Sequence, residues 1–337
     1  DTGENQQLLR NHQRYVGRLC RSPKVHDTQL NLPDEKNYHL LANSNGLLNE
    51  LEVEYNDSPQ ELSKGDVLVS LKACSLNFRD VLIGMGLYPG DCRELGGDKA
   101  GCVTAVGEGV SELKVGDRVL GVAGKGLSNE VVVNQTGLCV IPPELTDCEA
   151  AMIPAVWMTV YHALKQVAGL KGTESILIHT ATGGVGLAAI RYAQHIGARI
   201  YATAGSERKR QYLRELGIDY IYDSRNLDYV EKIKVDAKGQ GVDVVLNTLT
   251  GEGFVEGSLS CCTQGGRFIE LSKRDIWSET EVKAFRSDVN YHIVAIDLLS
   301  QEDPSWGGAL LQEVVTWFKE HSIESSPYVT YPIEETP

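Results

Sequence analysis

The stretch from Ile176 to Ala189 reads ILIHTATGGVGLAA and decides how the second half of the chain folds. The apolar residues 176–178 predict a buried strand, and the small residues from Leu187 onward predict a helix. The glycines between them let the backbone turn tightly and approach a ligand closely. A helix N-terminus offers unpaired N–H groups to a pyrophosphate, so this pattern predicts a dinucleotide site. The residues expected to form the site are Ala181, Thr182, Gly183, Gly184, Val185 and Gly186.

Length and composition are those of an ordinary globular protein with about two domains. The 337 residues are 42% hydrophobic and 23% charged. No apolar run reaches about 18 residues, so no membrane-spanning helix is expected, and no secretion signal is recognisable. The net charge of -14 argues against nucleic acid as the main partner. The eight cysteines form no C-x-x-C pair, so we interpret them as reduced thiols of a cytoplasmic protein, with no metal site.

Short strands broken by glycine turns predict a small antiparallel barrel in the first half of the chain. One helix, at 78–85, is expected to interrupt it. We assign residues 39–155 to the first part of this barrel domain and interpret the polar, aperiodic residues 1–38 as a linker or leftover segment. The expected strands include 67–71, 101–106 and 118–122.

After the barrel, strands alternate with helices, which predicts a mostly parallel, doubly wound α/β sheet. A helical segment, 149–167, comes first and contains Pro154 as a break or kink. We assign 156–290 to the nucleotide-binding domain and 291–337 to a return segment that completes the barrel domain and is truncated at its C-terminus. The expected strands are 176–178, 199–204, 220–223, 242–246 and 267–271.

The end of the second strand of this sheet predicts which nicotinamide cofactor binds. NAD sites carry an acidic residue about 20 residues beyond the glycines, but here the strand ends in Ala204-Gly205-Ser206 without a carboxylate. A hydroxyl group and cations attract a 2′-phosphate. We therefore predict NADPH; the alternative is that the basic run 208–210 is the solvated first turn of a helix, as charge runs usually are. The expected phosphate ligands are Ser206, Lys209 and Arg225.

Seven short motifs follow one another along the chain. They are LNFRDVL at 76–82, GLYPG at 86–90, LGG at 95–97, HTATGGVG at 179–186, NTLTG at 247–251, GGRF at 265–268 and SKRDI at 272–276. In this order they closely resemble the enoyl reductase domains of modular (type I) polyketide synthases, which are zinc-free members of the medium-chain dehydrogenase/reductase superfamily. The resemblance runs from about residue 40 to the end of the chain.

The resemblance implies a GroES-like β-barrel for the substrate, a Rossmann domain for NADPH and an active site between them. The implied reaction adds hydride to Cβ of an α,β-unsaturated thioester on an acyl carrier protein and then protonates the enolate at Cα. The implied partners are this carrier protein and other domains of a polyketide synthase, while the oligomeric state stays open. The alternatives are an enolate that closes a cyclopropane by displacing a γ leaving group, a free-standing quinone or enone reductase, and a silenced NADPH-binding structural domain.

Three residues are predicted to carry the chemistry. Lys273 follows the fifth strand at the carboxyl edge of the sheet, where it can contact the cofactor and stabilise or protonate an enolate. The resemblance to the fatty acid synthase reductase implies that Asp297 orients Lys273; the alternative is a helix cap. The resemblance implies that Tyr88 lies near Cα of the acyl group, where its phenol can donate a proton; the alternative is a tyrosine packed over the loop. His179 is expected to hold loop carbonyls, because this hydride transfer needs no histidine base.

Further residues are assigned to the substrate pocket and the nicotinamide end of the cofactor. Asn77 and Phe78 are expected to line that end, with Asn77 as a donor to the cofactor or to the thioester and Phe78 mainly as a core residue. Asn247 and Thr248 end the fourth strand and are expected to touch the nicotinamide ribose or amide. Trp157 is expected to line the pocket and pack between the domains.

The chain departs from the resembled family at two places. Zinc-dependent relatives carry Gly-His-Glu where this chain has GGD at 96–98, so the resemblance implies no catalytic zinc. Lys99 then stands where a small residue is common, and Ser272 stands where glycine is usual. The sequence does not decide whether Lys99 reaches the cleft.

Overall fold

The computed structural model describes residues 7–10, 13–16, 32, 37–43, 46, 51–56, 61–88, 92–321, 323 and 325–335. The chain divides into two units, and the larger, residues 34–330, contains every predicted site residue. In the smaller unit, β1 (Gln7–Arg10) pairs antiparallel with β2 (Gln13–Val16), and Ile333–Glu335 form a short 3-10 helix. Most of the segment 1–38 interpreted as a linker lies outside the described residues, as do Cys20 and residues 89–90 of the GLYPG motif.

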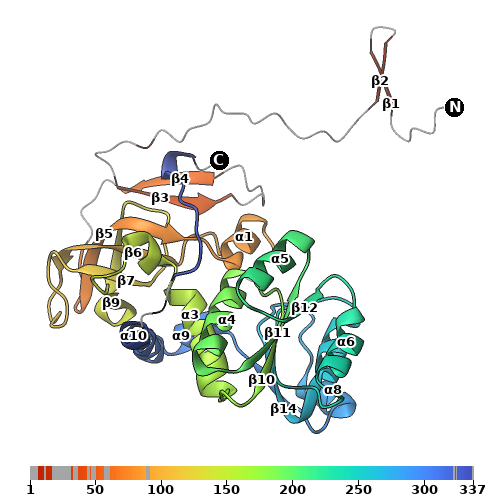
Figure 1. The fold of residues 1–337 in the computed structure, drawn as a ribbon. Helices are drawn as coiled ribbons and strands as arrows, with labels where there is room; N and C mark the ends of the chain where they lie inside the picture. The colour runs from red at the N-terminus through yellow and green to blue at the C-terminus, as the bar shows by residue number, and fades with distance from the viewer. Residues whose placement is uncertain are drawn as a thin grey trace. The chain divides into compact units, whose positions relative to one another are not determined.

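The first part of the larger unit is a small antiparallel sheet domain, as the glycine turns predict (Figure 1). Five strands hydrogen-bond in the order β8-β5-β6-β7-β9, and β3 pairs with β4 separately. The helix α1 (Phe78–Gly84) follows β5, where a helix is expected. The strands are β3 (Asn37–Ala42), β4 (Leu51–Asn56), β5 (Asp66–Ser75), β6 (Asp98–Val106), β7 (Arg118–Val122), β8 (Glu130–Asn134) and β9 (Leu138–Val140), with a 3-10 turn at Gln135–Gly137.

The second part is a six-stranded parallel sheet in the order β12-β11-β10-β13-β14-β15, the strand order of a dinucleotide-binding Rossmann fold. The sequence predicts five of these strands. The sixth, β15, reads NYHI and has no apolar run, because as an edge strand it is mostly exposed. It extends across the predicted domain boundary at residue 290. The strands are β10 (Ser175–Ile178), β11 (Arg199–Ala204), β12 (Tyr220–Asp223), β13 (Val242–Asn247), β14 (Cys262–Glu270) and β15 (Asn290–Ile293).

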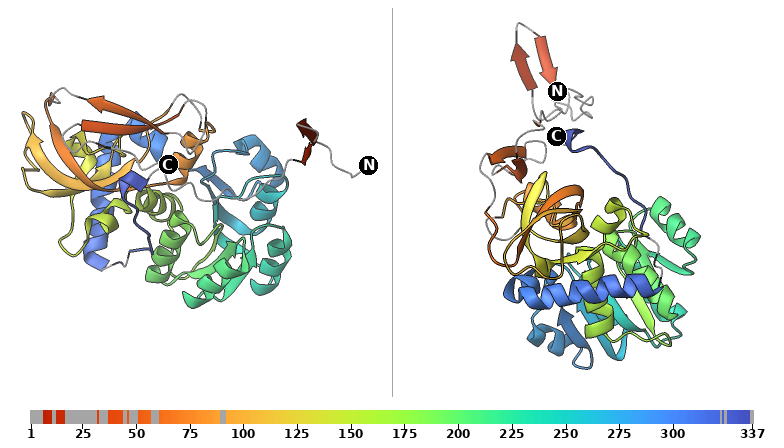
Figure 2. Two further views of the ribbon diagram at one scale, coloured as in Figure 1. Left: turned by 90° about the horizontal axis from the view of Figure 1, so that it is seen from above. Right: turned by 90° about the vertical axis from the view of Figure 1, so that its left-hand side faces the viewer.

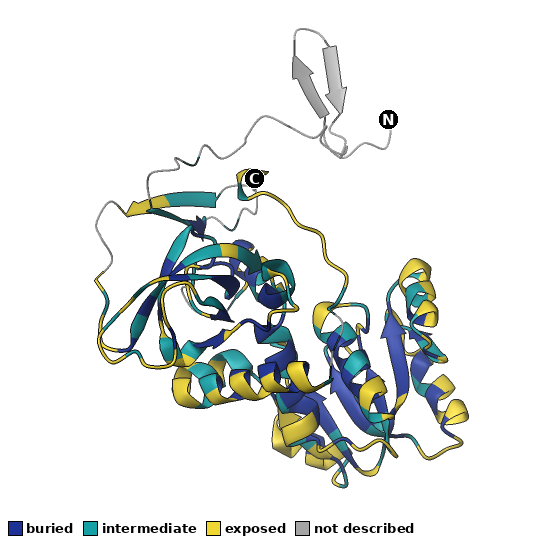
Figure 3. Cartoon of the chain, turned by 60° about the vertical axis from the view of Figure 1, so that its left-hand side comes forward, coloured by how far each residue is buried: buried dark blue, intermediate teal, exposed yellow. Residues whose placement is uncertain are grey.

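Helices cover this sheet, and its strands are largely buried in Figure 3. The helical segment predicted at 149–167 is divided as expected, because Pro154 begins a new helix. The helices are α2 (Asp147–Ala151), α3 (Pro154–Val160), a π-helix (Tyr161–Val167), α4 (Gly184–Ile196), α5 (Glu207–Glu215), α6 (Asp228–Asp236), α7 (Phe254–Ser260), α8 (Glu279–Phe285), α9 (Ile296–Glu302) and α10 (Pro304–His321).

One hydrophobic core joins the two parts of the larger unit. It contains Leu120 of β7 together with Ile176 of β10 and the apolar face of α10, the long blue helix in the right-hand view of Figure 2. Trp157 lies in this core, with ring centroids 5.4 Å from Trp317 and 4.7 Å from Phe318. The side chain of Trp157 is 4% exposed, so it packs where the parts meet, as expected, but does not line an open pocket.

Gly186 lets α4 begin close against the end of the preceding strand. A Cβ atom on Gly186 would lie 2.6 Å from both the Cα and the carbonyl carbon of Ala181. These are backbone atoms, so no side-chain rotation relieves the clash. Only glycine fits here, which is the close-packing role of the last glycine in a dinucleotide-binding turn.

We predict that Gly186→Ala lowers the free energy of unfolding by about 1–3 kcal/mol, because the added methyl group overpacks a fixed backbone contact. Urea titration of the cofactor-free protein measures the change. Gly184→Ala is the matched control, since a Cβ there would lie 3.4 Å from the nearest atom, Val156 Cγ2. Equal stability of the two variants would contradict the packing role of Gly186.

Candidate active site

The glycine turn lies at the carboxyl end of β10, where the strand order reverses between β10 and β13. In open α/β sheets ligands bind at this switch point. Gly183 and Gly184 are exposed there, and Thr182 and Val185 are half-buried. The first N–H groups of the 13-residue helix α4 have no partner within the helix, which fits the pyrophosphate of a dinucleotide. Ala181 is fully buried and donates its N–H to β11, so it shapes the turn from behind.

The residues expected to hold a 2′-phosphate come together at the end of β11. Ser206 caps α5, and its hydroxyl accepts the N–H of Lys209. The Arg225 side chain lies against Gly205, where a Cβ would be 3.2 Å from its Nε. Lys209 and Arg225 are exposed, and neither forms an ion pair with another described residue. They are therefore available to an anion.

The acidic groups near this place are already paired. Glu207 binds Arg210 and Arg214, at 3.0 and 2.8 Å. Asp223, at the end of β12, lies 3.3 Å from Arg210. Arg210 and Arg214 therefore neutralise these carboxylates, so Arg210 has a structural role within the run 208–210. Lys209 is left without an acidic partner among the described residues.

The ends of β10 and β13 meet through two threonine hydroxyls. Thr180 Oγ1 lies 2.7 Å from Thr248 Oγ1, and Thr180 has a φ of 45°, which is rare for a β-branched residue. The neighbouring Asn247 is fully buried and gives its amide N–H groups to Leu249 O and to Glu270. Both N–H groups of the Asn247 side chain are thus used within the protein, and its expected contact with the nicotinamide ribose or amide stays a prediction.

Glu270 is a buried carboxylate that the sequence analysis missed. It ends β14 and accepts hydrogen bonds from Asn247 Nδ2 at 2.8 Å and from the Ser272 N–H at 2.9 Å. Burial raises its pKa, and these hydrogen bonds partly oppose that effect. Glu270 thereby holds the start of the segment that carries Lys273. A glutamate at the end of the apolar run RFIE was the available signal.

His179 holds hydroxyl groups and not the loop carbonyls that the sequence suggested. Its Nδ1 lies 3.0 Å from Thr203 Oγ1, and its Nε2 lies 3.0 Å from Ser258 Oγ. The ring packs against Tyr229 and is 1% exposed. Burial lowers the pKa of His179 to about 3, so the neutral imidazole joins β10, β11 and α7.

Lys273, Asp297 and Tyr88 form one hydrogen-bonded chain. Lys273 Nζ donates to Asp297 Oδ1 at 2.6 Å, the contact expected of this pair. Tyr88 Oη donates to the other carboxylate oxygen, also at 2.6 Å. Burial alone would raise the pKa of Asp297, but the hydrogen bonds from Lys273 and Tyr88 lower it below its usual range. Asp297 is therefore an ionised acceptor between a residue of the sheet domain and one of the nucleotide domain.

Arg79 lies under the Tyr88 ring and has no counterpart among the predicted site residues. Its guanidinium carbon is 5.0 Å from the ring centroid, and its Nη2 donates to Cys92 Sγ at 3.4 Å. Burial and the hydrogen bond to Asp297 raise the pKa of Tyr88, whereas Arg79 lowers it. Asp297 thus favours the protonated phenol of Tyr88, whereas Arg79 favours the phenolate.

Asn77 is held by two buried carboxylates. Its backbone N–H donates to Asp80 Oδ2 at 2.7 Å, and its side-chain Nδ2 donates to Asp98 Oδ2 at 2.9 Å. Burial raises the pKa of Asp98 to about 7, against the lowering effect of hydrogen bonds from Asn77 and the Ala155 N–H. Phe78 is 74% exposed, so the core role expected for it is wrong. As the first residue of α1, it projects from the sheet domain.

Lys99 does not reach the cleft. Its side chain is 1% exposed, and Nζ donates to the carbonyls of Ala123 and Gly124 at 2.7 and 2.8 Å. Burial lowers the pKa of Lys99 to about 8, although Cys74 and Asp98 oppose that change. Lys99 therefore fixes the loop that follows β7.

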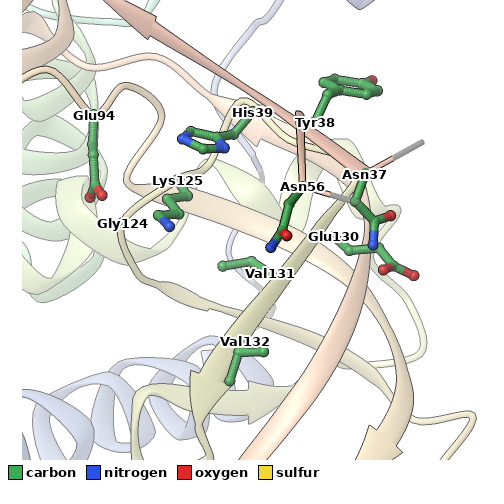
Figure 4. Close-up of a pocket in the computed structure, with 10 residues that line it drawn as sticks. All are labelled: Asn37, Tyr38, His39, Asn56, Glu94, Gly124, Lys125, Glu130, Val131 and Val132. Carbon is green, nitrogen blue, oxygen red and sulfur yellow. The ribbon is translucent and has the colours of Figure 1, made fainter. Parts of the chain in front are cut away.

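Other features of the larger unit are separate from this site. A cavity of about 300 Å³ lies at the edge of the sheet domain, lined among others by His39, Glu94 and Lys125 (Figure 4). None of the predicted site residues lines it. The described residues contain no cluster of three or more His, Cys, Asp or Glu side chains that could hold a metal ion. No helix in the described part of the chain has the length and hydropathy needed to span a bilayer.

Two family models match the two parts of the larger unit. An alcohol dehydrogenase GroES-like domain matches residues 63–160, and a zinc-binding dehydrogenase domain matches residues 184–299. Among curated proteins, a mycocerosic acid synthase-like polyketide synthase of Mycobacterium tuberculosis is 40% identical over 99% of this chain and 16% of its own length. A phthioceranic/hydroxyphthioceranic acid synthase of Mycobacterium bovis is 37% identical over 89% of this chain and 14% of its own length. The chain thus spans about a sixth of these relatives.

Solved structures of similar length match most of this chain. The CurK enoyl reductase is 34% identical with a TM-score of 0.82, over 88% of this chain and 93% of that one. The CurF ER cyclopropanase from the curacin A pathway is 32% identical with a TM-score of 0.82, over 89% and 93%. The resemblance in the motifs is thereby confirmed, and a nicotinamide cofactor is implied.

We predict that His179 makes the protein lose stability as the pH falls from 7 to 5. Its folded pKa of about 3 lies below the 6.5 of an unperturbed histidine, so the unfolded chain binds the proton first. The wild type should lose about 2 kcal/mol more than His179→Gln over this interval. Urea titration at both pH values measures the difference, with the exposed His292→Gln as the matched control. Identical pH dependence of wild type and His179→Gln would contradict the assignment.

Proposed function

The chain belongs to the polyketide synthase enoyl reductases of the medium-chain dehydrogenase/reductase superfamily, and from this membership we propose that it reduces an α,β-unsaturated acyl thioester with NADPH. The proposed substrate is carried by an acyl carrier protein. The proposed partners are the other domains of a synthase, since the curated relatives are about six times as long as this chain.

The observation that carries the proposal is the Tyr88–Asp297–Lys273 chain at the carboxyl edge of the sheet. When bound, the cofactor supplies a hydride for Cβ of the substrate. Negative charge then develops on the thioester oxygen, and the ammonium group of Lys273 is suited to donate a hydrogen bond there. Asp297 accepts from Lys273 and so keeps its Nζ at one position.

Tyr88 is our proposed proton donor at Cα. Transfer of its proton forms the Cα–H bond and leaves a phenolate, which regains a proton from water. The raised pKa keeps the phenol protonated at neutral pH, and the nearby cation of Arg79 stabilises the phenolate. Asp297 receives hydrogen bonds from both donors, which supports a shared role of Tyr88 and Lys273 in the two halves of the reaction.

Three features support NADPH as the cofactor. The exposed Gly183–Gly184 turn leaves room for a pyrophosphate at the start of α4. Arg225 and Lys209 are cations without an acidic partner among the described residues, and Ser206 adds a hydroxyl beside them. Together they would hold the 2′-phosphate that distinguishes NADPH from NADH.

We predict that Lys273→Met lowers kcat about 100-fold or more, because it removes a donor at the developing oxyanion. Asp297→Asn should lower kcat at least about tenfold while the KM for NADPH stays within about threefold. Oxidation of NADPH with an enoyl group on carrier protein measures both. Lys283→Met is the matched control, because Lys283 is exposed and pairs with Glu279 on α8. Wild-type kcat in Lys273→Met would overturn the assignment of Lys273.

The same assay separates the alternative reactions. Equal efficiency on carrier-bound and small thioesters would favour a free-standing reductase, and NADPH binding without turnover would favour a silenced domain. The CurF relative is a cyclopropanase, so a γ-halogenated enoyl substrate belongs in the panel. A saturated halide as the product supports simple reduction, whereas a cyclopropane would show ring closure.

We predict that Arg225→Ala and Lys209→Ala each raise the KM for NADPH roughly tenfold, because each loses a charge-assisted hydrogen bond of about 1.5 kcal/mol. The KM for NADH should stay unchanged, since NADH lacks the 2′-phosphate. Lys232→Ala is the matched control, because Lys232 is exposed on α6. A parallel rise for both cofactors would contradict a phosphate contact.

A further inference from the structure

The amide of Asn77 is held in one orientation by a carboxylate from another strand. Asn77 comes just before α1, and its Nδ2 donates to Asp98 Oδ2 at 2.9 Å, although 21 residues separate them. Asp98 is the first residue of β6 and is 1% exposed. Above pH 7 Asp98 is mainly ionised, and an ionised carboxylate accepts hydrogen bonds and donates none, so Asn77 turns its NH2 group, and not its carbonyl, toward Asp98.

Capping of α1 does not require this contact. Asp80 already accepts the backbone N–H of Asn77 at 2.7 Å and the N–H of Gly96 at 2.8 Å, which fixes the start of the helix. Of the groups of Asn77, Asp98 binds only the side-chain amide. The buried carboxylate therefore adds a constraint on the direction of one amide group.

Asp98 also connects Asn77 with the segment beside the glycine turn. Its two oxygens accept the N–H of Ala155, at 3.1 and 3.2 Å, in the first turn of α3. The next residue, Val156, is 3.4 Å from the position a Cβ would take on Gly184. In Figures 1 and 2, α1 lies on the side of the sheet domain toward the nucleotide domain. Asn77 is thus fixed relative to the cofactor turn.

We propose that Asp98 is a positioning residue that pins the Asn77 amide so that its second N–H is presented to the thioester oxygen of the substrate. This proposal rests on the proposed function. Asn77 is half-buried, and the hydrogen bonds of the described residues give its Nδ2 no partner other than Asp98. One N–H is therefore anchored while the other stays available.

Exchanging the two residues tests this role. In the double variant Asn77→Asp/Asp98→Asn, the amide introduced at position 98 can donate an N–H to the carboxylate introduced at position 77. Its carbonyl oxygen can still accept the Ala155 N–H. The packing and both contacts are kept, but position 77 has no N–H to offer. The single variants Asn77→Asp and Asp98→Asn are measured beside it at pH 8, where wild-type Asp98 is mostly ionised.

We expect the melting temperature of the double variant to lie within about 3 °C of that of the wild type. Its kcat on a carrier-bound enoyl group should nevertheless be at least about 100-fold lower than the wild-type kcat. The KM for NADPH should change less than about threefold. If the exchange restores kcat to within threefold of wild type, Asp98 is only structural and the proposal is overturned. If Asp98→Asn alone keeps full kcat, it is overturned as well.

A binding measurement separates failure of this proposal from failure of the proposed function. A saturated acyl pantetheine thioester cannot be reduced, yet its carbonyl accepts the same hydrogen bond. We expect the exchanged variant, loaded with NADPH, to bind it at least about tenfold more weakly than wild type. An inactive wild type would overturn the proposed function, whereas equal binding of the analogue by both proteins would overturn the role of Asp98.

Discussion

A carboxylate that is partly removed from water must receive hydrogen bonds, and the site depends on how Asp297 receives them. Lys273, which follows β14, and Tyr88, which follows α1, each donate at 2.6 Å. Tyr88 and Asp297 are 209 residues apart in the sequence. One charge therefore fixes the two proposed proton-active groups relative to each other and links the sheet domain to the nucleotide domain.

The same constraint recurs at Asp98, which is more deeply buried. It accepts hydrogen bonds from Asn77 of the sheet domain and from Ala155 at the start of α3, 57 residues away. The two carboxylates hold different donors: a lysine and a phenol at Asp297, an amide at Asp98. Lys99, next to Asp98, donates instead to the carbonyls that follow β7, so it does not compete with Asn77 for the Asp98 carboxylate.

Local patterns predicted most of the fold, because strands, glycine turns and helix breaks depend on neighbouring residues. The strands at 118–122, 199–204 and 220–223 agree with the structure to the residue. The edge strand β15 was missed because exposed edge strands lack an apolar run. Phe78 was misjudged because an aromatic side chain next to a helix start gives no sign of which face is open.

The sequence by itself determined the order of the two domains, the dinucleotide turn and the absence of a carboxylate after β11, since these lie in short contiguous stretches. It also pointed to the pair Lys273 and Asp297 through the family motifs. Only the tertiary structure decided which polar groups are free. Asn247 and His179 are occupied by buried partners, and Asp98 turns toward Asn77, because hydrogen bonds between distant segments form only when the chain is packed.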